Sequence, residues 1–175
     1  MRAAYAGIAG AFAHEACLTF LPGYAPLPVP GFAAVAAAVQ ERRAERGVLP
    51  IENNEAGPVE EARALLPGLR LVEEHWLPVR MHLLCLPGVD IDEVTTAVSH
   101  PVALRQCAAT LERLGLKPEA ASNTAAAAQA LKDRHKAALA SEAAARAYGL
   151  TVLMRDVHDR ADNATLFAIV ARKVG

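Results

Sequence analysis

Residues 48–59 read VLPIENNEAGPV, and this stretch passes from an apolar strand into a loop dense in polar side chains. The strand is predicted over residues 47–51, and Glu52, Asn53 and Asn54 follow its carboxyl end. Open α/β sheets bind their ligands at the carboxyl ends of strands, so these three side chains are candidates for a binding site. The spacing alone also allows an ordinary turn, because asparagine and glycine are common turn residues.

On the N-terminal side of this stretch, the apolar pattern predicts strands alternating with helices. A strand at 2–6 and a tight turn at 7–10 precede a helix from Phe12, in which apolar residues recur at helical spacing. Residues 22–31 are rich in proline and glycine and are expected to form a connection, and residues 32–45 are expected to form a helix.

On the C-terminal side the same alternation continues to the end of the chain. The predicted strands span 69–74, 79–86, 95–98, 117–121, 137–140, 150–155 and 164–172, and the predicted helices span 58–66, 99–114, 122–134 and 142–148. This order indicates an α/β protein with mostly parallel sheets covered by helices. We expect two lobes with a cleft between them, one formed by residues 1–75 plus 156–175 and the other by residues 76–155.

Composition restricts the classes of partner. The 175 residues carry a formal net charge of −1 and contain no long basic stretch, which argues against nucleic acid as a partner. No apolar run reaches the length of a membrane span, and the N-terminus does not have the pattern of an export signal. Cys17, Cys85 and Cys107 lie far apart, as expected of reduced, buried thiols in a cytoplasmic protein.

Small polar residues precede two of the predicted helices. Ser99 and His100 come before one, and Ser122, Asn123 and Thr124 come before the other. The simplest interpretation is helix capping, which contributes about 1 kcal/mol per cap. If two such helix ends face one site, their free N–H groups also suit an anion such as a carboxylate.

A second polar stretch opens the last predicted strand and contains Asn163, Thr165 and Phe167. By spacing alone, Thr165 is an ordinary strand residue. The sequence shows no Ser-His-Asp order, no phosphate-binding glycine loop and no cluster of histidines at metal-ligand spacing. These residues therefore give no sign of a metal site.

Four segments in order resemble the catalytic domain of prephenate dehydratase. Residues 50–59 are similar to the family's Pro-Ile-Glu-Asn-Ser segment with its following Gly and Val, and residues 99–107 to its Ser-His-Pro segment with Gln-Cys downstream. Residues 123–127 resemble its Thr-Ala helix start, and residues 137–150 its Ala-Ser and Tyr-Gly-Leu stretch. The four segments span most of the chain.

The resemblance implies two lobes like those of type 2 periplasmic binding proteins, a homodimer, and no cofactor. It implies loss of carbon dioxide and the ring hydroxyl from prephenate, or from its amino analogue arogenate, both of which carry two carboxylates. By this resemblance Thr165 donates a hydrogen bond to the leaving oxygen and Asn53 orients it. The implied substrate-binding residues are Glu52, Asn54, Ser99, His100, Ser122, Asn123, Thr124, Asn163 and Phe167.

The chain also departs from the family pattern. The arginine of the family's Thr-Arg-Phe motif is Leu166 here, which should slow the reaction unless another cation substitutes, with Arg80, Arg105 and Arg160 as candidates. We expect no ACT regulatory domain. Two alternatives therefore stay open: a decarboxylase that keeps the ring hydroxyl, and a binding protein without catalysis.

Overall fold

The computed structural model describes residues 1–173, which pack into two compact units. Of the described residues, unit 1 contains Met1–Ile8, Phe12–Val79 and 163–173, and unit 2 contains Ala9–Ala11 and Arg80–Asp162. The lobe division drawn from the sequence stays a prediction, and these units differ from it chiefly at residues 156–162. Those residues belong with unit 2 because the amide of Val157 donates to Met81 O and that of Asp159 to Gln106 O.

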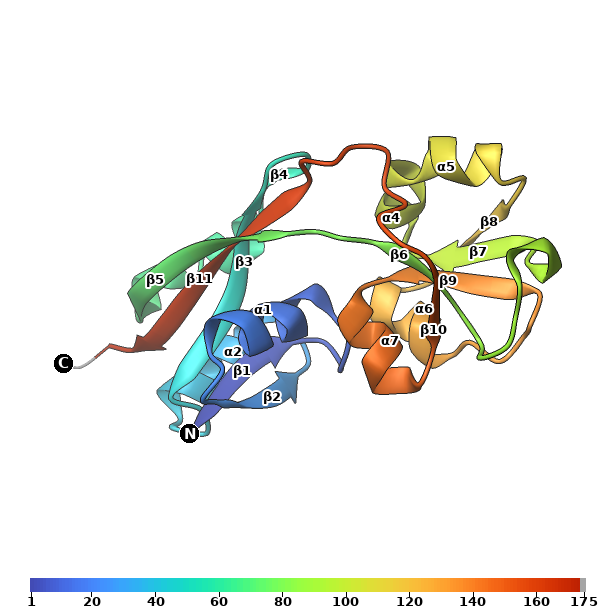
Figure 1. Ribbon diagram of the computed structural model, residues 1–175. Helices are drawn as coiled ribbons and strands as arrows, with labels where there is room; N and C mark the ends of the chain where they lie inside the picture. The colour runs from blue at the N-terminus through green and yellow to red at the C-terminus, as the bar shows by residue number, and fades with distance from the viewer. Residues whose placement is uncertain (174–175) are drawn as a thin grey trace. The chain divides into compact units, whose positions relative to one another are not determined.

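Unit 1 is built on a six-stranded sheet in the order β2-β1-β3-β11-β5, with the short β4 paired to β3. Its strands are β1 (Arg2–Ala6), β2 (Ala25–Val29), β3 (Arg46–Asn53), β4 (Gly57–Pro58), β5 (Leu69–Pro78) and β11 (Ala164–Arg172). Its helices are α1 (Phe12–Phe20), α2 (Phe32–Gln40), α3 (Glu60–Arg63) and the 3-10 turn η1 (Leu66–Gly68). Figure 1 shows β11, from the C-terminal end of the chain, side by side with β3 and β5, which come from its first half.

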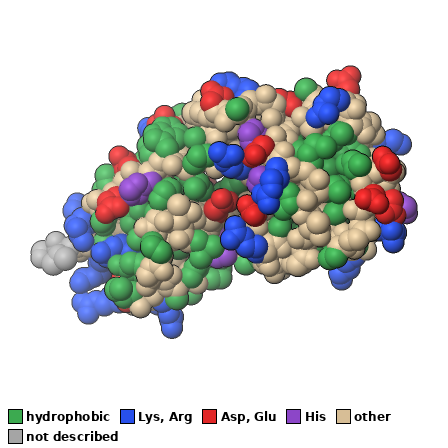
Figure 2. All heavy atoms as spheres, in the orientation of Figure 1, with side chains coloured by type: hydrophobic (Ala, Val, Ile, Leu, Met, Phe, Trp, Pro, Cys, Tyr) green, Lys and Arg blue, Asp and Glu red, His purple; other side chains and the backbone are tan. Residues whose placement is uncertain are grey.

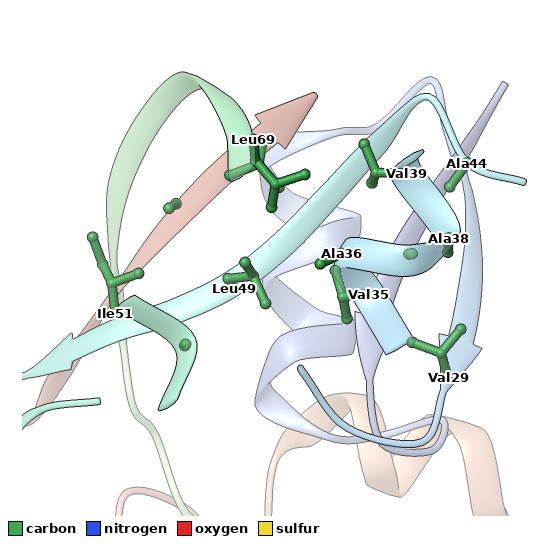
Figure 3. Close-up of a cluster of buried hydrophobic side chains, with 13 residues drawn as sticks. Val29, Val35, Ala36, Ala38, Val39, Ala44, Leu49, Ile51 and Leu69 are labelled. Atoms are coloured by element: carbon green, nitrogen blue, oxygen red, sulfur yellow. The ribbon is translucent and has the colours of Figure 1, made fainter. Parts of the chain in front are cut away.

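Apolar side chains cover both faces of this sheet. Figure 3 shows one face, where Val35 and Val39 of α2 pack beside Leu49 of β3. Burying each such side chain contributes roughly 1.5–3 kcal/mol. Gly47 allows this close packing, because a Cβ at that position would lie 2.9 Å from side-chain atoms of Val35 and Val170. The opposite face packs against α1 through a second cluster that includes Phe167.

Unit 2 is built on a five-stranded sheet in the order β10-β6-β9-β7-β8. Its strands are β6 (His82–Cys85), β7 (Thr96–Ser99), β8 (Lys117–Ala120), β9 (Lys136–Ala140) and β10 (Thr151–Met154). Its helices are α4 (Pro101–Gln106), α5 (Ala108–Arg113), α6 (Thr124–Gln129), α7 (Glu142–Tyr148) and the 3-10 turn η2 (Ile91–Glu93). Much of its core consists of alanines, which let α6 lie close to both β9 and α7.

The α/β class with two helix-flanked sheets is confirmed, but the expected mostly parallel arrangement is corrected to a mixed one. β1 pairs in parallel with β2 and β3, and β7 pairs in parallel with β8 and β9. β11 runs antiparallel to both β3 and β5, and β6 runs antiparallel to β9 and β10. The late strand β11 inserts between two earlier strands of unit 1, which periodicity along the chain does not reveal.

Two element predictions were wrong for local reasons. Residues 22–31, expected to be a connection, contain β2, which pairs with β1 alone. Prolines are tolerated there because an edge strand leaves one side without ladder hydrogen bonds. The helix expected over 99–114 is two helices, since Cys107 breaks it with φ −115°.

Candidate active site

In unit 1 the carboxyl end of β3 meets the start of β11, and Asn53 pairs directly with Thr165 across the two strands. The side-chain amide nitrogen of Asn53 donates to Thr165 Oγ1 over 3.0 Å, to Asn163 Oδ1 over 2.9 Å and to Ala164 O over 3.1 Å. One donor group thus holds three consecutive residues of the returning chain.

The amide oxygen of Asn53 binds the opposite partners. It accepts hydrogen bonds from the backbone amides of Glu55, over 3.0 Å, and Ala56, over 2.9 Å. Because these two groups can only donate, and because Ala164 O can only accept, the nitrogen and oxygen of the Asn53 amide have one consistent assignment.

This assignment determines what the Thr165 hydroxyl can do. The Asn53 nitrogen can only donate, so it occupies a lone pair of Thr165 Oγ1 and leaves the hydroxyl proton directed elsewhere. Thr165 is half-buried, and its hydroxyl makes no other hydrogen bond within residues 1–173. The hydroxyl proton of Thr165 therefore has no acceptor among the described residues.

The neighbouring asparagines hold the same loop. Asn163 is 3% exposed and accepts from Asn53. The side-chain oxygen of Asn54, Oδ1, accepts a hydrogen bond from the backbone amide of Ala164 over 2.8 Å, and the backbone amide of Asn54 donates to Ala164 O over 3.1 Å. The side chains that share hydrogen bonds with Thr165 and its neighbour Ala164 are therefore neutral amides.

Glu52, a predicted binding residue, and Leu166, which replaces the family's arginine, have structural and packing roles. Glu52 pairs with Arg63 over 2.6 Å. Leu166 lies directly between Glu52 and Trp76 across the sheet, and it packs against the cluster shown in Figure 3. Successive strand residues face opposite sides, so Glu52 and Leu166 lie on the face away from Asn53 and Thr165.

Phe167 shares the face of Thr165, but its side chain is buried in the core. It is 2% exposed and packs in the cluster beside α1. It supports β11 rather than presenting a ring to a ligand. Position 166 faces away from the Thr165 hydroxyl, so an arginine there would leave the strand on the opposite face.

In unit 2, the helix ends that follow the parallel strands β7 and β8 carry the other predicted residues. Ser99 is fully buried and donates to Leu139 O over 2.7 Å, so it ties β7 to β9. His100 caps α4, since its Nδ1 accepts from the Val102 amide over 3.1 Å. An accepting Nδ1 places the proton of a neutral imidazole on Nε2, which is then a donor.

The second of these helix ends belongs to α6. Asn123 caps it by accepting from the Ala126 amide over 2.7 Å. Ser122 is exposed and Thr124 is half-buried at the first helical position. Capping is confirmed for His100 and Asn123, and binding of a carboxylate stays a prediction.

Ser141 caps a helix of unit 2 and also makes a contact outside that helix. It caps α7 by accepting from Ala144 over 3.0 Å, and its hydroxyl donates to Gly10 O over 2.7 Å. Tyr148 donates to Ala9 O over 2.5 Å. These bonds anchor residues 9–11 in unit 2. The contact joins segments far apart in the sequence, so local sequence patterns do not predict it.

Two of the three arginines considered as substitutes for the missing arginine form ion pairs. Arg80 pairs with Asp156 over 3.4 Å and Arg160 pairs with Asp162 over 2.9 Å. Arg105 forms no ion pair in the part of the chain that the structure describes. No group of three or more His, Cys, Asp or Glu side chains within residues 1–173 is placed to hold a metal ion.

His82 of unit 2 lies in an environment that disfavours its protonated form. Burial is the main cause that lowers the pKa of His82, with Arg155 and His158 acting in the same direction and Asp156 and Glu142 opposing them. Its Nδ1 accepts from the Asp156 amide over 3.0 Å, a bond that protonation of Nδ1 abolishes. Burial and this hydrogen bond both favour the neutral form of His82.

Comparison with known proteins gives a consistent family. The model of the family described as prephenate dehydratase matches residues 3–174. The chain is 39% identical to arogenate dehydratase/prephenate dehydratase 2 of Arabidopsis thaliana, covering 99% of this chain and 47% of that protein. It is 38% identical to a bifunctional N-acyl-homoserine lactone acylase/prephenate dehydratase of Komagataeibacter europaeus, covering 97% of this chain and 62% of the relative.

A solved structure shows the same fold at high similarity. The chain superposes on the structure titled GqqA, a novel type of quorum quenching acylase, with a TM-score of 0.93 and 37% identity. The match covers all of this chain and 65% of that one. The chain thus spans about half to two thirds of the length of these similar proteins. Within residues 1–173, no helix combines the length and apolar character needed to span a membrane.

The stability of the protein should fall as pH drops below about 6.5, the ordinary pKa of histidine. The lowered pKa of His82 means that the unfolded chain binds more protons than the folded chain below this value, so unfolding becomes easier. His82→Asn keeps an acceptor for the Asp156 amide without titrating, so its free energy of unfolding should change less with pH. Urea unfolding of wild type and variant between pH 5 and pH 8 measures this pH dependence, and an equal dependence in the two proteins would contradict this role of His82.

Proposed function

This chain belongs to the prephenate dehydratase family, and we propose that it removes carbon dioxide and the ring hydroxyl from prephenate to give phenylpyruvate. The observation that carries this proposal is the 3.0 Å hydrogen bond from Asn53 to Thr165, which leaves the Thr165 proton available to the leaving oxygen. The proposal places the protein among the lyases of phenylalanine biosynthesis, in the shikimate pathway to the aromatic amino acids.

The chemistry explains why neutral groups suffice. Formation of an aromatic ring drives the reaction, so the protein must mainly orient the substrate and stabilise the departing hydroxide. A hydroxyl held by Asn53 donates a hydrogen bond where negative charge develops. Glu52 is turned to the other face and paired with Arg63, so its negative charge does not oppose the leaving group.

Removal of the carboxylate as carbon dioxide places a second demand on the site. A carboxylate loses carbon dioxide more readily where it is less hydrated. Thr165 pairs with the buried Leu77 on β5, and the buried Phe167 follows two residues later on the same face of β11. Apolar side chains therefore adjoin the hydroxyl. A polar donor set beside an apolar surface suits loss of both groups.

We further propose that His100, Ser122 and Thr124 of unit 2 bind a carboxylate of the substrate. Support comes from the adjacent parallel strands β7 and β8, whose carboxyl ends lead into α4 and α6. Ser99 is left out of this set because its buried hydroxyl already donates to Leu139 O. Prephenate and arogenate share the ring carboxylate and differ at the side-chain carbon, so either substrate suits this assignment.

The acylase activity in the name of the Komagataeibacter relative is not carried over to this chain. Within residues 1–173, no serine or cysteine is hydrogen-bonded to a histidine. The Ser99 and Ser141 hydroxyls donate to backbone carbonyls. Burial raises the pKa of Cys17 and of Cys107 to about 12, which keeps both thiols protonated.

We propose a cytoplasmic location and a homodimer. The three buried, unpaired cysteines support a reducing compartment. The ten-residue strand β5 supports association, because it forms the outer edge of the unit 1 sheet and pairs with β11 alone. Its Trp76 is 48% exposed, and an exposed edge with large apolar side chains favours pairing between chains.

Trp76→Lys should therefore shift the protein from dimer to monomer, because a charge on an edge strand opposes pairing. Sedimentation velocity at micromolar concentration measures this shift. Leu18→Lys is the matched control, since Leu18 is 47% exposed but lies on α1. A monomeric wild-type protein, or a variant that remains dimeric, would exclude β5 as the contact.

Thr165→Val should lower the rate of phenylpyruvate formation at least about 100-fold, as expected when a donor to a developing negative charge is removed. Valine has the same shape and suits a strand, so the melting temperature should change little. Thr165→Ser keeps the hydroxyl and should retain most of the activity.

Absorbance of the product and release of carbon dioxide from purified protein and prephenate measure this reaction. Carbon dioxide without an aromatic product would identify a decarboxylase instead. Binding without turnover would identify a binding protein. A Thr165→Val variant as active as wild type would remove Thr165 from the reaction.

A further inference from the structure

Four arginines line one depression of about 470 Å³ at the end of the unit 1 sheet. Figure 2 shows blue side chains gathered at the end of this unit where the N-terminus lies. The lining residues are Val39, Arg42, Ala44, Glu45, Arg46, Arg70, Ala171 and Arg172.

The arginines come from separate parts of the fold. Arg46 begins β3, Arg70 lies near the start of β5, and Arg172 ends β11, while Arg42 belongs to the turn after α2. This turn holds Arg42 at φ 62°, a conformation that costs a non-glycine residue about 1 kcal/mol or more. The sheet therefore gathers charges that are far apart in the sequence.

This depression is distinct from the candidate active site. Arg46 is the first residue of β3 and Asn53 is the last. Thr165 lies near the start of β11, and Arg172 is its last residue. Seven residues separate the members of each pair, which corresponds to about 23 Å along a strand. The two sites lie at opposite ends of the same pair of strands.

The charge in the depression is not neutralised by the described part of the protein. Arg42, Arg70 and Arg172 form no ion pair with any residue in the range 1–173. Glu45 is the only acid in the lining, and its carboxylate accepts the backbone amide of Arg2 over 2.5 Å. Four guanidinium groups and one carboxylate leave a formal charge of +3.

Several arginines elsewhere in the chain are paired with carboxylates. Arg43, the immediate neighbour of Arg42, pairs with Glu41 over 2.8 Å. Arg63 and Arg134 also pair with carboxylates. The whole chain has a formal net charge of −1, so a local charge of +3 in this depression differs from the average of the protein.

We propose that this depression binds a small phosphate ester. Guanidinium groups bind phosphate through paired N–H donors, and groups arriving from four elements suit the several oxygens of a phosphate better than a single planar carboxylate. Val39, Ala44 and Ala171 supply an apolar wall for the organic part of the ester. The volume lies within the range of small-molecule sites.

Isothermal titration of the full chain with phenyl phosphate and inorganic pyrophosphate at low salt tests this proposal. Both should bind with a submillimolar Kd. The double variant Arg70→Gln/Arg172→Gln should weaken binding at least tenfold. Arg43→Gln is the matched control, because Arg43 is paired and lies outside the lining, and it should bind like wild type.

Two further measurements keep the test independent of folding and of catalysis. In wild-type protein, phenyl phosphate should shift the backbone resonances of Arg46, Arg70 and Ala171 and leave those of Asn53 and Thr165 in place. The double variant should convert prephenate at the wild-type rate. The proposal is overturned by millimolar or absent binding, by a double variant that binds like wild type, or by citrate binding as tightly as pyrophosphate, since citrate carries similar charge without phosphate.

Discussion

The amide of Asn53 makes five hydrogen bonds that join the loop after β3 to the start of β11. Both ends of the amide are used, so the group cannot rotate without losing bonds at each end. Its nitrogen can only donate, and this single chemical fact sets the direction of the Thr165 hydroxyl. The reaction chemistry proposed for the chain depends on that direction more than on any charge.

The two faces of β11 explain how an altered motif coexists with an ordered site. Thr165 and Leu166 are neighbours in the chain but lie on opposite faces of the strand. Leu166 extends the apolar cluster of α2 and α3, while Thr165 remains beside Asn53. Leucine in place of the family's arginine therefore alters the face of β11 that packs against α2 and α3. The face that carries Thr165 keeps its hydrogen bond with Asn53.

Local patterns predicted much of the fold, since β1, β8, β9 and α7 lie within a residue or so of where the apolar periodicity placed them. They failed where the outcome depends on distant partners. The proline-rich β2 forms because β1 offers it an edge, and β11 runs antiparallel because it returns from unit 2. The Asn53–Thr165 pairing was implied by resemblance to a family. Burial of Phe167 and Ser99 depends on strands far away in the sequence, so their site assignments could not be tested before the fold was known.

The most direct test of the central claim is the pH profile of Asn53→Asp. Ionised aspartate can only accept, so it should take the Thr165 proton for itself and lower the dehydration rate about 100-fold at pH 8. Protonated aspartate can donate again, so the rate of this variant should rise as pH falls through the pKa of the new carboxyl group, while wild type shows no such rise. A variant with a wild-type rate at pH 8, or with a low rate that does not recover at lower pH, would contradict the claim that donation from residue 53 directs the Thr165 hydroxyl.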